Sequence, residues 1–351
     1  MTARRLVAEP LPGVPEIEAG DDLAGLLAGA AARVGGLRAG DVLVVAHKAV
    51  AKAEGRVVPL AGVEPGARAL ALAAEHGKDA RLVELILRES AELVRADAGR
   101  LIARTRHGFV CANAGVDQSN AGGEERAVLL PEDPDASARA LRARLGCAVV
   151  VGDSFGRAWR VGQAEVAIGC AGLAPLEDWR GRPDGAGRIL RESVELVRAD
   201  AGRFIARTRH GFVCANAGVD QSNAGGEERA VLLPEDPDAS ARALRARLGC
   251  AVVIGDSFGR AWRVGQAEVA IGCAGLAPLE DWRGRPDRAG RLLRATQIAI
   301  ADQAAAAADL VRGKDTAEPA VRIRGLERHV LPDDGPGAAA LLRAAGEDLF
   351  G

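Results

Sequence analysis

The sequence predicts an α+β fold in which one segment is present twice. Residues 86–188 align with residues 189–291 at a constant offset of 103. Short apolar runs of strand length are interspersed with amphipathic stretches of helix length, without the regular βαβ rhythm of a doubly wound sheet. The prediction is therefore mixed sheets with packed helices, built from a unique beginning, a doubled middle and a unique end.

The repeat defines the four segments that we predict. They are the head (residues 1–85), copy 1 (residues 86–188), copy 2 (residues 189–291) and the tail (residues 292–351). The copies differ at only four pairs, which are Ala91/Val194, Leu101/Phe204, Val151/Ile254 and Gly185/Arg288. Three are exchanges between apolar residues and the fourth lies in a Gly/Pro-rich loop, so both copies keep the same reactive side chains.

Composition places the chain among ordinary soluble globular proteins. Hydrophobic residues make up 48% of the sequence and charged residues 27%, and the net charge at pH 7 is -2. Because this charge gives no overall basic field, nucleic-acid binding is not expected. No apolar run reaches the roughly 18 residues of a membrane span, and the N-terminal residues lack the apolar core of a signal peptide. We therefore expect a cytoplasmic protein without membrane association.

The six cysteines are three cysteines present twice. None of them has C-x-x-C spacing, so the sequence favours small buried apolar residues in a reducing compartment over a disulfide framework. The three of copy 1 and their counterparts in copy 2 are Cys111, Cys147, Cys170, Cys214, Cys250 and Cys273.

Lysine is rare, because 42 of the 46 basic residues are arginine. A compact ammonium and a planar guanidinium are not interchangeable where a phosphate is held as a point charge, so the lysines are candidates for phosphate contacts. The alternative is chance retention on a solvated surface. The lysines are Lys48, Lys52, Lys78 and Lys314.

In the head, residues 5–17 are expected to form a short strand followed by a proline-rich loop. A helix should follow at residues 22–34, begun by an aspartate cap. Residues 41–46 are a continuous apolar run, typical of a strand buried on both faces. Such strands commonly present ligand-binding groups at their C-terminal ends, where this chain has His47 and Lys48.

Two further helices are expected at residues 65–77 and 79–95, and copy 1 begins inside the second. Residues 101–105 and 109–112 should pair as a hairpin. A polar loop then follows at residues 115–123.

The second half of copy 1 should contain a strand at residues 127–130 and a helix from Asp133 to Leu145. A fully apolar strand at residues 147–151 should end in a polar turn. In the tail, an Ala-rich helix is expected at residues 289–312, then a strand at 320–323 and a terminal helix.

Two loops of each copy carry groups typical of divalent metal sites. In copy 1, Asp117 lies in a loop rich in Gly, Ser and Asn, and Asp153 and Ser154 follow the apolar strand. Mg²⁺ and Mn²⁺ prefer such carboxylate and hydroxyl oxygens. Proximity does not follow from sequence, so the alternative is that one carboxylate ends a turn and the other caps a helix. The copy 2 counterparts are Asp220, Asp256 and Ser257.

Several common catalytic motifs are absent from the sequence. It contains no P-loop, no protein-kinase set, no dinucleotide-binding glycine fingerprint and no closely spaced zinc ligands. The turn at residues 152–156 departs from Gly-x-Ser-x-Gly, which argues against a hydrolase nucleophile elbow.

Four segments together resemble the family of coenzyme F420-0:L-glutamate ligases, also called gamma-glutamyl ligases. The resemblance extends from near the N-terminus to about Gly325. Over this range the chain is similar to the ligase half of the actinobacterial bifunctional enzyme. The nitroreductase-like half of that enzyme is not expected here. The segments are Leu11-Pro-Gly-Val-Pro-Glu, Ala46-His-Lys-Ala-Val-Ala-Lys-Ala-Glu-Gly, Thr105-Arg-His-Gly-Phe-Val-Cys-Ala-Asn-Ala-Gly-Val-Asp-Gln-Ser-Asn and Asp153-Ser-Phe-Gly-Arg-Ala-Trp-Arg.

The resemblance implies the fold of that family and a ligase that joins L-glutamate to coenzyme F420-0. Its cofactors would be GTP as co-substrate and Mg²⁺ or Mn²⁺, with K⁺ as a further candidate ion, and a homodimer is expected. The implied reaction passes through an acyl phosphate and uses no covalent nucleophile. By resemblance the nucleotide contacts are Leu11, Pro12, Gly13, Val14, His47, Lys48, Lys52, Asn120 and Asn223, and the metal ligands are Asp117, Asp153, Ser154, Asp220, Asp256 and Ser257.

The duplication leaves open which copy would form such a site. Head and tail occur once, so one chain can complete at most one site of this type. The spare copy must bury its strands against the other copy or in a partner chain. The alternative function is a non-catalytic nucleotide- or metal-binding protein, or a ligase inactivated by the duplication.

Overall fold

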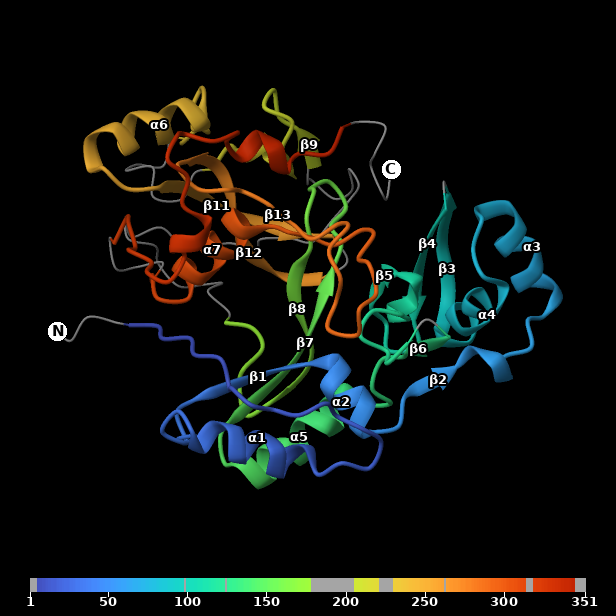
Figure 1. Ribbon diagram of the computed structural model, residues 1–351. Coiled ribbons are helices and arrows are strands. Elements are labelled where there is room, and N and C mark those ends of the chain that lie inside the picture. Colours follow the sequence, from blue (N-terminus) through green and yellow to red (C-terminus); the bar gives the residue numbers. More distant parts are fainter. Residues whose placement is uncertain are drawn as a thin grey trace.

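The computed structural model confirms a mixed α and β architecture with small sheets (Figure 1). None of its helices, among the residues it describes, is long and apolar enough to cross a membrane. The structure describes residues 5–97, 99–123, 125–177, 205–220, 230–261, 263–313 and 318–344.

One sheet joins the head to copy 1. β1 (Val42–Ala46) pairs in parallel with β7 (Ala148–Phe155), and β7 pairs antiparallel with β8 (Ala164–Ala171). The helices α1 (Leu23–Ala32) and α5 (Pro134–Leu145) cover this sheet and share its hydrophobic core (Figure 1). The head therefore packs on copy 1.

The prediction that the strand at residues 41–46 is buried on both faces is wrong. Leu43 and Val45 are buried, whereas Val42 and Val44 are 46% and 64% exposed. β1 lies at the edge of its sheet and only one face is covered, so alternate side chains meet the core.

A second unit combines the rest of the head with the start of copy 1. The helices α3 (Ala67–His76) and α4 (Ala80–Glu89) pack against an antiparallel sheet of β3 (Ser90–Asp97), β4 (Arg100–Thr105) and β5 (Val110–Ala112). The predicted hairpin of β4 and β5 is confirmed. The predicted helix at 79–95 is wrong after Glu89, because the following residues pair with β4 instead.

The two units are linked through short elements. α2 (His47–Ala53) follows β1 directly, and β2 (Val57–Pro59) pairs antiparallel with β6 (Arg126–Val128). Two 3₁₀ turns, η1 (Leu60–Gly62) and η2 (Asn113–Gly115), border this region.

Copy 2 repeats the local structure of copy 1. β9 (Ile205–Arg207) and β10 (Val213–Ala215) form the same hairpin as β4 and β5, and the 3₁₀ turn η3 (Asn216–Gly218) follows β10 as η2 follows β5. α6 (Pro237–Leu248) corresponds to α5, and β11 (Val252–Arg260) pairs with β12 (Arg263–Ala274) as β7 pairs with β8.

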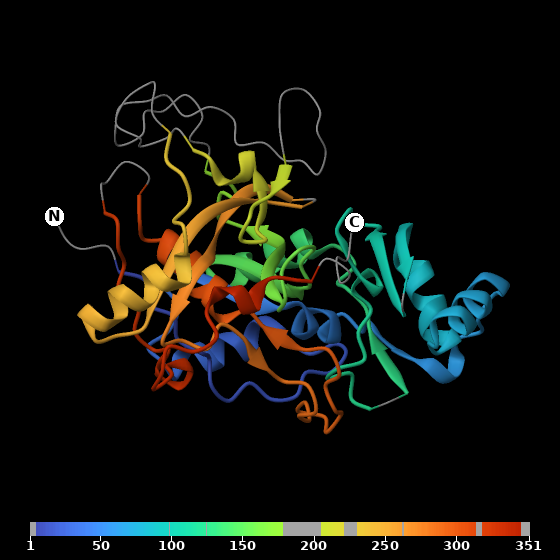
Figure 2. The ribbon, with the colours of Figure 1, turned by 90° about the horizontal axis from the view of Figure 1, so that it is seen from above.

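The tail packs on copy 2. α7 (Ile300–Asp309) lies on β11 and β12, together with η5 (Ala338–Leu341). β13 (Glu280–Asp281) pairs with β14 (Gln297–Ile298), and η4 (Glu327–His329) follows. In Figures 1 and 2, α3 and α4 lie at the opposite end of the molecule from α6.

Three further predicted elements are wrong. Residues 5–17 and 320–323 contain no strand, and the helix predicted at 289–312 is limited to α7. Residues 289–299 instead form turns and β14, because Gln297 and Ile298 pair with β13. Much of the predicted terminal helix lies outside the described residues.

The two copies contact each other through reciprocal hydrogen bonds. Arg160 Nη2 of copy 1 donates to Ala270 O of copy 2 at 2.7 Å, and Arg263 Nη2 of copy 2 donates to Ala167 O of copy 1 at 2.7 Å. These pairs are related by the offset of 103 in both directions. Such an exchange of partners is characteristic of an isologous interface, which here lies within one chain.

Packing beside these arginines shows the same reciprocity. A Cβ atom placed on Gly162 would lie 2.7 Å from Leu279 Cδ2, and one placed on Gly265 would lie 2.9 Å from Leu176 Cδ2. Leu279 is the copy 2 counterpart of Leu176. Each copy thus brings a leucine against the glycine turn of the other.

The head protects apolar side chains in copy 1 whose counterparts are exposed in copy 2. Leu141 is 7% exposed and its counterpart Leu244 is 44% exposed; Val128 is fully buried and Val231 is 49% exposed. All six cysteines are free, as expected, but Cys250 is exposed because no head strand covers it.

This asymmetry predicts unequal effects of one substitution made at two equivalent positions. We expect Leu141→Ala to lower the free energy of unfolding by about 2–4 kcal/mol, because it leaves a cavity beneath α1. Leu244→Ala, the matched control, should cost less than about 1 kcal/mol. Urea unfolding of both variants measures the difference, and equal costs would contradict the assignment of the head to copy 1.

Candidate active site

Lys48 of the head lies on the Asp117 loop of copy 1. Lys48 Nζ is 2.5 Å from Asp117 Oδ2 and 2.5 Å from Ser119 Oγ. Asp117 is held further by Ser119, whose backbone N–H donates to Oδ1 at 2.9 Å. The backbone of Asp117 bridges to Val128, which fixes the loop against β6. One of the rare lysines therefore meets a predicted metal ligand.

The pKa of Asp117 lies below its usual range. Partial burial raises it, but the Lys48 charge and the hydrogen bonds from Lys48 and Ser119 outweigh that effect. Asp117 is consequently an anion at neutral pH.

His47 contacts the other predicted carboxylate of copy 1. Its Nε2 is 3.2 Å from Asp153 Oδ1, and the ring is buried. Asp153 is placed there because Ala46 and Gly152 are partners in the parallel pairing of β1 with β7. Since His47 and Lys48 are consecutive, the carboxylates of Asp153 and Asp117 both lie around the beginning of α2.

A fourth side chain with oxygen atoms at this end of the sheet is Glu165, which is absent from the sequence-based prediction. Ser154 Oγ donates to Glu165 Oε1 at 2.6 Å, and the two residues are partners in the β7–β8 ladder. The hairpin register would have identified Glu165, because it places the residue opposite Ser154 on the same face.

The predicted nucleotide contact Asn120 is held by the end of copy 2. Asn120 N donates to Asp287 Oδ2 at 2.6 Å, and Arg288 N donates to Asn120 Oδ1 at 3.2 Å. Arg291 Nη2 also donates to Gln118 Oε1 at 2.8 Å. Sequence reasoning missed these residues, which lie 167 or more positions from their partners.

The loop at Leu11 to Val14 is fixed by Arg33, whose Nη1 donates to Pro12 O and Gly13 O, each at 3.1 Å. Gly13 has a φ of 75°, which favours glycine. Lys52 pairs with Glu16 at the end of this loop.

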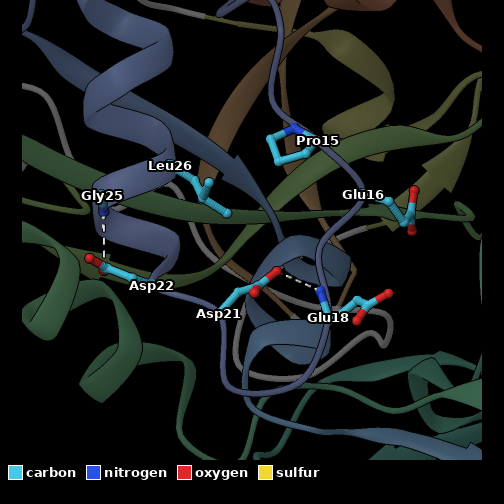
Figure 3. A pocket seen from close by; sticks show the side chains of 7 residues that line it. All are labelled: Pro15, Glu16, Glu18, Asp21, Asp22, Gly25 and Leu26. Carbon is cyan, nitrogen blue, oxygen red and sulfur yellow. Dashed lines mark hydrogen bonds between the residues drawn. The ribbon is translucent and has the colours of Figure 1, made fainter.

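A pocket beside this loop is lined mainly by carboxylates (Figure 3). Two of these carboxylates accept hydrogen bonds from backbone N–H groups. Asp21 accepts from Glu18 N at 2.8 Å, and Asp22 accepts from Gly25 N at 3.1 Å. Its charge is unsuited to a bare polyphosphate. The lining residues are Pro15, Glu16, Glu18, Asp21, Asp22, Gly25 and Leu26.

The oxygen atoms around α2 are of the chemical types that bind hard divalent cations. Asp117 and Asp153 supply carboxylates and Ser154 a hydroxyl, the ligands that Mg²⁺ and Mn²⁺ prefer. Within the described part of the chain, no three His, Cys, Asp or Glu side chains converge as a metal-binding cluster. The described His, Cys, Asp and Glu side chains alone therefore do not form a complete metal site.

The equivalent side chains of copy 2 have different surroundings. Asp220 is exposed and Asp256 is partly buried. Ser257 Oγ donates to Glu268 Oε1 at 3.1 Å, but Glu268 is buried and paired with Arg312 of the tail. Asn223 lies outside the described residues. Lys48 is engaged with copy 1.

Cys111 lies near Asp153 but is not prepared as a nucleophile. Burial, assisted by the Asp153 charge, raises the pKa of its thiol to about 12. The thiolate, which is the reactive form, is therefore negligible at neutral pH.

The sequence profile of the F420-0:Gamma-glutamyl ligase family matches residues 13–197 and, a second time, residues 183–325. The chain belongs to this family. The coenzyme F420:L-glutamate ligase of Methanothermobacter thermautotrophicus is 44% identical over 195 residues, which are 54% of this chain and 77% of that protein. The one of Methanopyrus kandleri is 45% identical over 192 residues, or 53% and 74%. The doubled family match reflects the internal repeat.

The contact of Lys48 with Asp117 predicts a change in a single pKa. Lys48→Met should raise the pKa of Asp117, because burial then acts without the opposing charge. Carboxyl ¹³C NMR titration measures the shift. Lys52→Met is the matched control and should leave the pKa of Asp117 unchanged, since Lys52 pairs with Glu16.

The same contact determines how stability depends on pH. A depressed carboxyl pKa contributes stability above the unfolded value of about 3.9, and this contribution is lost as the pH falls through the folded value. Lys48→Met should reduce this acid sensitivity. The same pKa of Asp117 in wild type and Lys48→Met would contradict the contact.

Proposed function

We propose that the protein is a GTP- and divalent-metal-dependent ligase that forms a gamma-glutamyl amide bond between L-glutamate and coenzyme F420-0. It would act in the biosynthesis of coenzyme F420. Family membership supports this proposal, as do the names of the relatives. The observation that carries it is the placement of consecutive head residues, His47 and Lys48, on two carboxylates of copy 1.

In the proposed reaction, an oxygen of the F420-0 carboxylate attacks the γ-phosphorus of GTP. The bond from that phosphorus to the β–γ bridging oxygen breaks, which yields GDP and an acyl phosphate. The amine of glutamate then attacks the acyl carbon, phosphate leaves, and the amine loses a proton. This chemistry requires positioning and charge neutralisation more than a reactive side chain.

The residues around α2 suit these roles. Lys48 would hold a phosphate oxygen, with Lys52 nearby on the same helix, and Asp117, Asp153 and Ser154 would hold the divalent ion. When bound, that ion would neutralise the charge of the phosphates. The high pKa of Cys111 is consistent with a reaction that uses no thiolate nucleophile.

We further propose that copy 1 carries the active site and that copy 2 supports it. Copy 2 supplies the loop of Asp287 and Arg288, which holds Asn120. The isologous contact between the copies would then replace the interface of the expected homodimer.

The ligase reaction is tested by phosphate release from GTP. Release should require Mn²⁺ or Mg²⁺, L-glutamate and F420-0 together, and mass spectrometry should show one added glutamyl group per phosphate. Equal release without glutamate would refute the ligase assignment.

The choice of copy is tested by one substitution at two equivalent sites. Asp117→Asn should lower kcat/KM by at least about 100-fold, in keeping with the loss of charged groups that act on a phosphoryl transfer. Asp220→Asn should stay within about threefold of wild type. If Asp220→Asn were the damaging variant, the site would belong to copy 2.

A second candidate function is nucleotide and metal binding without turnover. It is favoured by the hydrophobic packing, because the head shares a core with copy 1 and the tail shares a core with copy 2. A protein lacking residues 189–291 separates the candidates. Turnover by the full chain supports the ligase, whereas turnover by the shortened chain alone indicates that the duplication inactivated it.

A further inference from the structure

Asp302 of the tail is buried in a site made by both copies. Its Oδ2 accepts from Arg160 Nε at 2.8 Å and from Arg157 Nη1, and its Oδ1 accepts from Arg160 Nη2 at 2.6 Å. The backbone N–H of Ala270 in copy 2 also donates to Oδ1 at 2.7 Å. We call Arg157, Arg160 and the backbone of Ala270 the Asp302 site. Asp302 is buried, with 4% of its surface exposed.

The isologous contact creates the same arrangement a second time, with the copies exchanged. Arg260 and Arg263 of copy 2 correspond to Arg157 and Arg160, and Ala167 corresponds to Ala270. We call these three residues the Arg260–Arg263 site. Since α7 is present once, the tail fills only one of the two sites.

The arginines of the second site have the same orientation as those of the first. Arg157 Nε and Nη2 donate to Gly162 O at 3.0 Å and to Val161 O at 2.5 Å. Arg260 makes the equivalent bonds to Gly265 O at 3.1 Å and to Val264 O at 2.5 Å. These bonds orient Arg260 Nη1 in the same way as Arg157 Nη1, the atom that contacts Asp302.

Arg263 repeats the backbone contact of Arg160 but not its carboxylate contact. Its Nη2 donates to Ala167 O, and its Nε is buried without a hydrogen-bond partner. Ala167 pairs with Gly152 as Ala270 pairs with Gly255, at the same irregularity of each hairpin. The counterparts of the donors that hold Asp302 are therefore also close to one another, because Arg263 contacts the backbone of Ala167.

This arrangement leaves two positive charges without a carboxylate. Within the described residues, no acidic side chain forms an ion pair with Arg260 or Arg263. Burial lowers the pKa of both guanidinium groups, and the charge of Arg263 lowers that of Arg260 further. In the first site, the charge of Asp302 opposes the same repulsion by raising the pKa of Arg157, although burial still lowers it. A partly buried cationic pair of this kind is stabilised by an anion.

We propose that the Arg260–Arg263 site binds a small organic carboxylate in the place that Asp302 occupies in the first site. The fork of two guanidinium groups and one backbone N–H matches a planar carboxylate. This site combines Arg260 and Arg263 of copy 2 with the backbone of Ala167 in copy 1, at the contact between the copies. It does not depend on the ligase activity.

Formate is the probe, because it is the smallest carboxylate. Titration of the full chain with ¹³C-formate, at constant ionic strength in chloride, should show one saturable site by line broadening. Thermal unfolding in the same series should show a rise in Tm of about 2–4 °C at ten times the Kd. Phosphate is the comparison anion, and binding tighter than that of formate would overturn the carboxylate assignment.

Two variants locate the site. Arg263→Gln should abolish formate binding, whereas Arg242→Gln, which removes an exposed arginine of α6, should leave it unchanged. Asp302→Ala should lower Tm and raise the number of bound formates from one to two. Because Asp302→Ala keeps Arg260 and Arg263, it tests the proposal even if Arg263→Gln fails to fold. Absence of formate binding to wild type, or equal binding to wild type and Arg263→Gln, would overturn it.

Discussion

The parallel pairing of β1 with β7 is the constraint on which the rest of the structure depends. The head contributes β1 to the sheet of β7 and β8, so this strand adds to copy 1. The pairing places the end of β1 beside Gly152, so His47 meets Asp153 and the next residue, Lys48, meets Asp117. It also covers the core of copy 1 and leaves equivalent side chains of copy 2 exposed. One backbone pairing thus selects both a fold and a candidate site.

The duplication is accommodated because the two copies complement each other. Each supplies an arginine to a backbone carbonyl of the other, and each packs a leucine against a glycine turn. The head packs on copy 1, whereas α7 of the tail, which occurs once, packs on copy 2 and also binds Arg157 and Arg160 of copy 1 through Asp302. This division explains why one arginine pair is neutralised by Asp302 and its counterpart is not.

Local structure could be predicted where local chemistry determines it. The sequence predicts an aspartate cap at the start of α1, a helix beginning at Asp133 and the hairpin of β4 and β5, and the structure confirms all three. The predicted helix at 289–312 failed because β14 pairs with β13, a tertiary effect that overrides the helix propensity of alanine. The predicted strand at residues 5–17 failed because no neighbour pairs with it. The exposure of Val44 required knowledge that β1 lies at a sheet edge.

The candidate site could be predicted as residue types but not as a geometry. Asp117 and Lys48 are 69 residues apart, and only the fold brings them together. Asp287 and Arg288 were missed because their contacts with Asn120 cross from copy 2 to copy 1. Residues that are identical in two copies differ in role only through their surroundings, which the sequence does not show.

Hydrogen exchange measured by mass spectrometry tests the packing of the head most directly. Peptides from β7 and β11 are distinguishable, because copy 1 has Val151 where copy 2 has Ile254. β7 pairs on both edges, with β1 and β8, whereas β11 pairs with β12 alone in the described structure. The account predicts slower exchange in β7 than in β11. Equal rates, or slower exchange in β11, would contradict it.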